Sequence, residues 1–206
     1  SMALGLPEDG MIIALDKNSE TNTKAKEFFK KAEQDKKIKT IVNPALDTLN
    51  ELKKENLVVF PTETVYGLGA IGNSEIAINS IYHAKKRPSN NPLIVHTFNK
   101  KEAEKYAEFT STADVLTKRY WPGPLTVILQ TKQNNLAKSL SQGKSTIAIR
   151  VPSHPVARDL LEKIKIPILA PSANKSGGVS PTEIDHVKND FGPEFKGKDW
   201  NLSKII

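Results

Sequence analysis

The sequence predicts an α/β fold with helices packed around a central sheet. Short apolar strands alternate with amphipathic helices along the chain, and no repeat or linker interrupts the pattern. The 206 residues suit a single hydrophobic core, and a composition of 38% hydrophobic and 26% charged residues is typical of a globular protein. No apolar run approaches the roughly 18 residues of a transmembrane helix, so we expect no membrane partner.

Hydrophobic spacing and capping residues predict the elements of the first third of the chain. Asn43 as N-cap and Pro44 at the first helical position indicate a helix start, with Leu46, Leu49 and Leu52 on its buried face. The elements expected here are a strand at 11–15, a helix with Ala25, Phe28, Phe29 and Ala32 on one face, a strand at 38–42, the helix from 44, and a buried strand at 57–60.

The remaining elements follow a turn-rich segment, "PTETVYGLGA" (61–70). Ser74 begins a helix that buries Ala77, Ile78 and Ile81, and Ser153 is expected to cap a later one. The strand at 145–151 alternates, with Ile147, Ile149 and Val151 on one face and Thr146, Ala148 and Arg150 on the other. The other expected elements are strands at 93–96, 125–129 and 166–170, helices at 100–109 and 112–121, and a final helix from Thr182.

Composition also limits the class of site. A net charge of +7 favours an anionic partner such as a nucleotide, phosphate or RNA, without choosing among them. The absence of cysteine excludes disulfides and thiolate metal sites and fits a reducing, cytoplasmic setting. No close metal-ligand spacing relates the four histidines, His83, His96, His154 and His186, so no structural zinc site is expected.

The segment "GKST" (143–146) looks like the end of a phosphate-binding P-loop, but the rest of that motif is missing. A P-loop needs a glycine at position 138, where this chain has Lys138, and a helix after the lysine. A strand with alternating apolar residues follows instead. We therefore reject a P-loop.

Three polar segments are candidates for ligand binding. Thr62 and Thr64 share a face if the strand at 57–60 continues, and Thr146 and Arg150 share one with only Ala148 between them. The loop "PSANKSGGVSPT" (171–182) follows a buried strand, where ligands of open α/β sheets bind. Its Ser172, Asn174, Ser176 and Ser180 suit phosphate and ribose oxygens. A strand exit, a half-exposed sheet and a surface loop are the respective alternatives.

The stretch "AKKRPSNNPLIVH" (84–96) places three cations before a proline. Cations near a helix C-terminus and a proline that stops the helix are ordinary, and this explains Lys86. No serine–histidine–acid order and no carboxylate pair stands out elsewhere. Chemistry on this chain would therefore depend on positioning and charge stabilisation, as in nucleotidyl transfer.

Together these segments resemble one family. "FPTETVYGLGA", "AKKRPSNNPLIVH", "WPGPLTVIL", "STIAIRVPSHPVA" and "PILAPSANKSGGVSPT", between about Asn43 and Phe191, resemble in order and spacing the YrdC-type threonylcarbamoyl-adenylate synthases. The resemblance includes a K-x-R pair, Lys85 and Arg87, and an S-x-N pair, Ser172 and Asn174. It implies a YrdC-like twisted mixed β-sheet flanked by helices, with a concave basic substrate cleft.

The resemblance implies a nucleotidyltransferase that converts L-threonine, bicarbonate or CO2, and ATP into threonylcarbamoyl-AMP and pyrophosphate. The product would pass to a tRNA threonylcarbamoyl transferase complex for N6-threonylcarbamoyladenosine at position 37, and weak tRNA binding is a further expectation. Mg2+ would accompany ATP, held mainly by phosphates and water, and no side chain is singled out as a ligand. The implied ATP contacts are Lys85, Arg87, Asn91, Thr146, Ser172, Asn174 and Ser180. The implied threonine contacts are Thr64, His96, Arg150 and the backbone near Ala170.

These residues have physically consistent roles within the implied reaction. Lys85 and Arg87, as the catalytic cations, would clamp the triphosphate and offset the repulsion between a carbamate and ATP. Arg150 would hold the threonine carboxylate with its guanidinium fork, and Thr64 and His96 would read the hydroxyl or amine.

Two other functions remain open at this point. One is an RNA-binding module of the same fold without adenylation activity, and the other is a carbamoyl-adenylating domain as in hydrogenase maturation. For the organisation of the chain, we expect an N-terminal extension of uncertain role at 1–42. A YrdC-like domain at 43–206 would follow, without the family's C-terminal strands.

Overall fold

A computed structural model describes residues 12–16, 38–42, 44–134, 140–191 and 202–205. Eight of its strands form one mixed sheet in the order β10-β3-β4-β9-β5-β8-β7-β6. Their bounds are β3 Leu57–Phe60, β4 Gly67–Ile71, β5 Ile94–His96, β6 Ala107–Glu108, β7 Thr126–Thr131, β8 Thr146–Arg150, β9 Ile168–Leu169 and β10 Leu202–Ile205. Two further strands, β1 (Ile12–Asp16) and β2 (Ile38–Val42), pair in parallel with each other.

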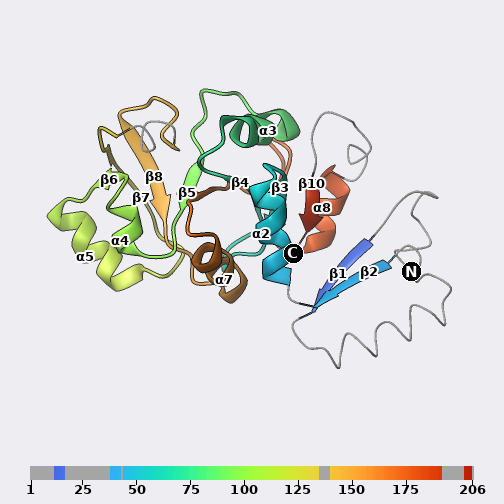
Figure 1. The fold of residues 1–206 in the computed structure, drawn as a ribbon. Coiled ribbons are helices and arrows are strands. Elements are labelled where there is room, and N and C mark those ends of the chain that lie inside the picture. Colours follow the sequence, from blue (N-terminus) through green and yellow to red (C-terminus); the bar gives the residue numbers. More distant parts are fainter. Residues whose placement is uncertain (1–11, 17–37, 43, 135–139, 192–201, 206) are drawn as a thin grey trace.

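Helices flank the eight-stranded sheet, as the sequence predicts for an α/β protein (Figure 1). The described helices are α2 Pro44–Lys53, α3 Glu75–Lys85, α4 Lys100–Ala103, α5 Ser111–Tyr120, α7 Pro155–Ile164 and α8 Ile184–Phe191. Helix α3 packs on β4 and β3, and α2 packs against α7. None of the helices described is long and apolar enough to cross a bilayer.

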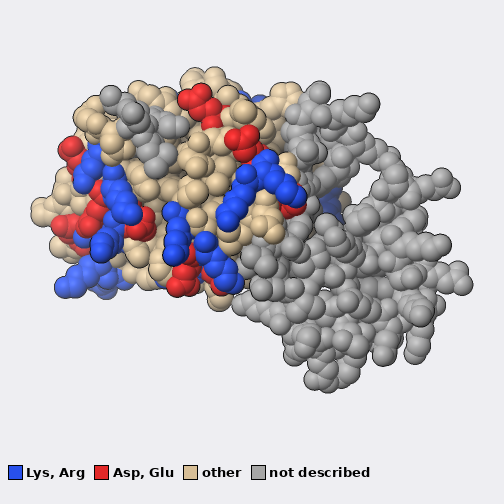
Figure 2. All heavy atoms as spheres, viewed as in Figure 1, with Lys and Arg blue, Asp and Glu red and all other residues tan. Residues whose placement is uncertain are grey.

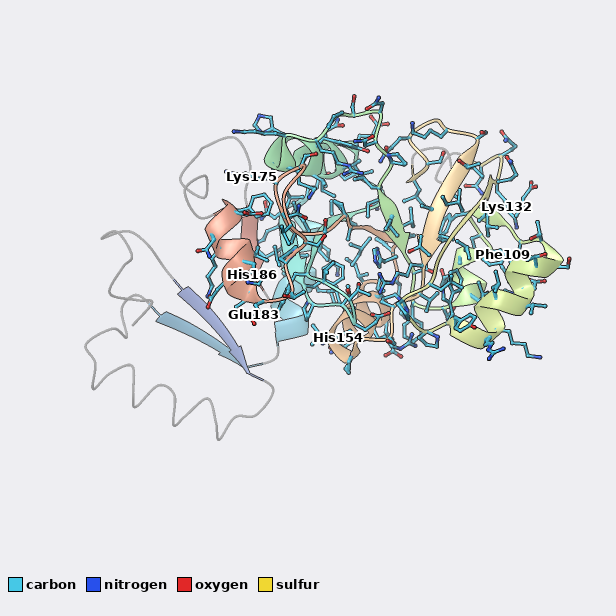
Figure 3. All side chains as sticks on the ribbon, turned by 180° about the vertical axis from the view of Figure 1, so that it is seen from behind. Phe109, Lys132, His154, Lys175, Glu183 and His186 are labelled. Carbon is cyan, nitrogen blue, oxygen red and sulfur yellow. The ribbon has the colours of Figure 1, made fainter. Side chains whose placement is uncertain are left out.

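Strand β9 joins the two halves of the sheet. It pairs antiparallel with β4 through Ala70 and Ile71 on one side, and with β5 through Val95 and His96 on the other. Strands β5 and β8 then run parallel, with His96 opposite Arg150. In the view from behind, Lys175, which is near α3 and α8, lies at one end of the eight-stranded sheet, and Phe109 and Lys132 lie at the other end (Figure 3). This sheet order places β4 and β9, which are about a hundred residues apart in the chain, side by side in the interior of the sheet.

Most of the predicted elements are confirmed. Ser74 caps α3 by accepting the N–H of Ala77, and Ala77, Ile78 and Ile81 are buried as expected. Leu49 and Leu52 of α2 are buried, while Leu46 and Asn43 lie outside the residues whose side chains are described. The strand at 146–150 confirms the rejection of a P-loop. The expected helix around Ala25 to Ala32 also lies outside the described residues.

Three local predictions are wrong. The segment 67–71 was expected to be part of a turn but forms β4. Glycine is rare in strands, yet here it fits a close approach, because a Cβ on Gly69 would lie 2.7 Å from the Phe60 ring. The helix expected at 100–109 ends at Ala103, and β6 follows. Helix α7 is capped by His154, whose Nδ1 accepts the Val156 N–H, and not by Ser153.

For the threonines after β3, the structure confirms the alternative of a strand exit. The strand ends at Phe60, so Thr62 and Thr64 do not continue its alternation. The hydroxyl of Thr62 instead accepts the N–H groups of Thr64 and Val65, each at 3.2 Å, and donates to the Val65 carbonyl at 2.6 Å. A threonine hydroxyl that bonds its own backbone in this way favours a turn over a strand.

Candidate functional site

The turn after β3 delivers two side chains to Arg150 on β8. The Thr64 hydroxyl lies 3.2 Å from both Nη1 and Nη2 of Arg150. Nη2 also lies 3.0 Å from Glu63 Oε1, and Nε donates to the Gly123 carbonyl at 3.3 Å. Arg150 is only 7% exposed, and a buried guanidinium needs a nearby anion. Glu63 supplies that anion.

Glu63 is ionised at neutral pH. Burial raises the pKa of its carboxyl, but hydrogen bonds from its own N–H, from Arg150 and from the Ser153 N–H outweigh this, together with the Arg150 charge. The net result is a pKa below the usual value. Arg150 and Glu63 therefore form a charged pair at the end of β8.

His96 lies beside this pair as a neutral ring. Burial, reinforced by the charge of Arg150, lowers the pKa of His96 to about 4. Its Nδ1 is 3.2 Å from the Ile94 carbonyl, and because a carbonyl can only accept, Nδ1 carries the proton. In a neutral ring Nε2 then has only its lone pair. His96 can therefore accept a hydrogen bond at Nε2, and it does not act as a cation.

A second cluster forms where α3 meets the loop after β9. Lys85 is 1% exposed, and its Nζ donates to the Ser172 carbonyl at 2.6 Å and to the Asn174 carbonyl. The Lys85 carbonyl in turn accepts the Ser176 N–H at 2.9 Å. Lys85 is therefore hydrogen-bonded to this loop through both its side chain and its backbone.

The loop after β9 is attached to the turn after β3 as well. Ser172 forms an isolated antiparallel bridge with Gly67, and the Tyr66 N–H donates to the Pro181 carbonyl at 2.9 Å. Within the loop, Asn174 Nδ2 donates to the Lys175 and Gly178 carbonyls at 2.8 and 2.9 Å. Asn174 Oδ1 is buried and accepts no hydrogen bond among the described residues. This oxygen could accept a hydrogen bond from a bound ligand.

Arg87 belongs to a third, more open segment. Its Nε and Nη2 donate to the Asn91 and Pro92 carbonyls at 3.4 and 3.1 Å, which closes the short loop after α3. The Tyr82 hydroxyl also donates to the Asn91 carbonyl, and Lys144 Nζ donates to the Asn90 carbonyl at 2.9 Å. Because Arg87 uses two of its five N–H groups in these contacts, it has donors left for an anion.

The structure brings most of the predicted site residues together in these clusters. Thr64, His96 and Arg150 form the first, Lys85, Ser172 and Asn174 the second, and Arg87 and Asn91 the third. Ala170 is buried after β9, and its N–H donates to the Ile94 carbonyl at 2.9 Å. Thr146 lies on the Arg150 face of β8, and Ser180 is exposed in the loop, but neither side chain has a contact that joins it to a cluster among those described.

Sequence reasoning missed Glu63. It stands between the two threonines that drew attention to this segment, and it is the only acidic residue there. The sequence places Arg150 on a strand but does not show that it is buried, and it is the burial that calls for a carboxylate partner.

Two other features bear on the site. Within the described residues, no group of three or more His, Cys, Asp or Glu side chains gathers in a way that could hold a metal ion. A hollow of about 560 Å³ lies between α4, α5 and the start of α7, lined by Phe98, Trp121 and Arg158 among others, but no predicted site residue borders it. On the face shown in Figure 2, Lys and Arg are interspersed with Asp and Glu, and the predicted basic cleft stays a prediction.

Two family models match the chain. The Sua5/YciO/YrdC model, described as "Telomere recombination", matches residues 50–198, and an O-methyltransferase model matches residues 1–62. The first match includes every residue of the candidate site. The second includes β1 and β2 and overlaps the first by about a dozen residues.

Several known proteins are similar to this chain. The threonylcarbamoyl-AMP synthase of Bacillus subtilis is 46% identical over 147 residues, which is 71% of this chain and 42% of that protein. The synthase of Pyrococcus abyssi is 46% identical over 141 residues, or 68% and 41% of the two chains. The structure of P. abyssi Sua5 complexed with L-threonine has a TM-score of 0.71 and 35% identity, over 95% of this chain and 49% of that one. The chain thus spans about two fifths of the length of these curated relatives.

Proposed function

Because the chain belongs to the Sua5/YciO/YrdC family, we propose that it forms threonylcarbamoyl-AMP and pyrophosphate from L-threonine, bicarbonate or CO2, and ATP. The curated relatives are named for this product, and one solved relative holds L-threonine. The observation that carries the proposal is the cluster of Thr64, His96 and Arg150 at one edge of the sheet. It lies next to a loop anchored by Lys85.

The first cluster suits an amino acid with a side-chain hydroxyl. Arg150 would attract the carboxylate of threonine, and neutral His96 would accept a hydrogen bond at Nε2. The Thr64 hydroxyl is engaged by Arg150 and by Thr62, so its main part would be to hold the guanidinium. Discrimination in favour of threonine would then depend on His96.

The second and third clusters suit a triphosphate. Arg87 would contact the phosphates with its remaining N–H groups, and the N–H groups and hydroxyls of the loop at 172–180 would contact phosphate and ribose oxygens. Two anions meet when the carbamate oxygen attacks the α-phosphorus and pyrophosphate leaves. The charges of Lys85 and Arg87 would lower their repulsion.

Mg2+ is proposed to accompany ATP. Since the described residues offer no cluster of carboxylates, phosphate oxygens and water would supply its ligands. Bound in this way, it would neutralise charge on the phosphates. The proposed later partner is a tRNA threonylcarbamoyl transferase, which consumes the product.

The proposal predicts that pyrophosphate release from ATP and Mg2+ requires both L-threonine and bicarbonate. Removing either should lower the rate to background, because no carbamate then forms to attack ATP. The measurement is a coupled pyrophosphate assay on this chain. Calorimetric titrations with ATP and with threonine should accompany it. Release that does not depend on threonine would refute the proposal.

Turnover is further expected to fall as pH rises through about 8. Burial, aided by the charge of Arg87 and opposed by Asp190, lowers the pKa of Lys85 to about 8, so its positive charge beside the phosphates is lost above that pH. This loss of turnover does not come from unfolding. Between pH 8 and 10.5, the pKa of Lys85 in the unfolded chain, the unfolded chain holds a proton on Lys85 that the folded chain has released. Over that range the contribution of Lys85 to the free energy of unfolding rises with pH.

The pH prediction is checked by pairing two titrations of the same chain. One follows the rate of pyrophosphate release, and the other follows the Lys85 ε-methylene by NMR. Circular dichroism at each pH reports the fold. A rate that stays constant while the NMR signal titrates would show that the charge of Lys85 is not used.

A further inference from the structure

We propose that Glu63 is the positioning residue that fixes the guanidinium of Arg150, and that threonine itself does not touch it. This inference rests on the proposed function only for the identity of the ligand. The pairing of Glu63 with Arg150 is a property of the ligand-free chain.

The donors of Arg150 can be counted one by one. A guanidinium has five N–H groups. The Nε hydrogen faces the Gly123 carbonyl, one hydrogen of each Nη faces the Thr64 hydroxyl, and the second Nη2 hydrogen faces Glu63. The contacts that the structure describes account for four of the five hydrogens, and the remaining one is on Nη1. The orientation of that hydrogen is set by the other four.

Thr64 alone cannot set this orientation. The single hydrogen of the Thr62 hydroxyl goes to the Val65 carbonyl, so in the 3.0 Å contact between the two threonines Thr64 is the donor. The Thr64 oxygen therefore gives its hydrogen to Thr62 and its lone pairs to Arg150. It is a neutral acceptor and cannot compensate the charge of a buried guanidinium.

Glu63 compensates the charge of Arg150 with a carboxylate that is buried. Both of its carboxylate oxygens are closed off from solvent, although the side chain as a whole is 18% exposed. A ligand entering from solvent therefore does not reach the Glu63 carboxylate oxygens. The charged partner that the structure gives this carboxylate is Arg150, with Nη2 3.0 Å from Oε1.

Removing the charge of Glu63 should therefore weaken threonine binding selectively. In Glu63→Gln the shape is kept, but Arg150 loses its counter-ion and can turn towards solvent. We expect the KM for threonine to rise about tenfold or more, with the KM for ATP and kcat changed less than about twofold. Glu63→Asp keeps the charge and should recover part of the loss. Glu102→Gln, which removes an exposed pair with Lys105, is the matched control and should behave as the unchanged chain.

A readout without any ligand tests the positioning itself. The Nε–H NMR signal of Arg150, assigned with Arg150→Lys, should be sharp and slow to exchange in the unchanged chain and in Glu102→Gln. It should broaden or disappear in Glu63→Gln. A merely structural role would instead lower the melting temperature and raise both KM values together.

The outcomes separate the two proposals. If the unchanged chain binds no threonine, the proposed function fails, while the NMR comparison still decides the role of Glu63. If the unchanged chain binds threonine but Glu63→Gln keeps both the KM for threonine and the Arg150 signal, the inference about Glu63 is overturned. A parallel rise of both KM values overturns it as well.

Discussion

Replacing Arg87 with alanine is expected to slow pyrophosphate release by about 100-fold or more while the chain stays folded. Arg87 is only partly buried, and its described contacts are hydrogen bonds to two carbonyls of its own loop. The fold therefore loses little. In the proposed reaction, ATP would in contrast lose a planar cation at the phosphates, where charge changes.

The measurement for Arg87 is steady-state pyrophosphate release together with a thermal melt. The neighbouring Lys86 offers a matched control, because it is exposed and lies in the left-handed region with φ of 51°. Lys86→Asn removes one positive charge from the same loop and suits that backbone conformation. It should release pyrophosphate at nearly the original rate. Equal losses in the two variants would mean that only the general charge of the loop matters.

Replacing Lys85 with methionine is expected to abolish turnover by a different route. Methionine fills much of the same space but takes the Nζ donor from the Asn174 carbonyl and leaves the Ser172 carbonyl with the Asn174 N–H alone. The free energy of unfolding should fall by about 1–3 kcal/mol, and the loop at 172–180 should lose its arrangement. Lys85 would thus act on ATP both by its charge and by shaping the loop.

Urea unfolding and pyrophosphate release on the same samples test this prediction. Lys163→Met, at an exposed helical lysine paired with Asp159 at 2.8 Å, controls for loss of a lysine as such. It should keep both rate and stability. A Lys85→Met chain that is as stable as the original would show that the two carbonyl bonds do not hold the loop.

The fold class and the family were predictable because they depend on features that the sequence shows directly. Strands such as 57–60 and 146–150 are apolar runs or clean alternations, and Ser74 and Thr110 are ordinary N-caps. The five motifs led to the family, and the match over residues 50–198 confirms it. The mixed sheet with flanking helices is likewise confirmed.

The errors arise where tertiary contacts override local preference. The sequence suggested a turn at Gly67 and Gly69, yet both lie in β4. At Gly69 the Phe60 ring and Ile168 of β9 occupy the space that a side chain would need. The cap of α7 depends on a ring nitrogen of His154, which no spacing rule distinguishes from the Ser153 hydroxyl.

The candidate site shows the same limit. Residue types suggested Lys85 and Arg87 as equal partners on a triphosphate. Their surroundings differ, because Lys85 is enclosed with two carbonyls and Arg87 keeps donors towards solvent. Burial of this kind depends on where β9 and its loop lie, and that follows from the complete fold. The individual ligand contacts and the division at residue 42 stay predictions.

The short strand β9 also bears on the order in which the protein can fold. The sheet becomes continuous only when β9, residues 168 and 169, pairs with β4 and β5. In the sequence, β4 precedes β9 by about a hundred residues. During synthesis, β4 and β5 therefore leave the ribosome before β9, the strand that pairs with both of them. Folding dominated by such distant pairings is slow, and exposed edges invite association with other chains. A nascent chain is thus expected to depend on protection from chaperones until β9 has emerged.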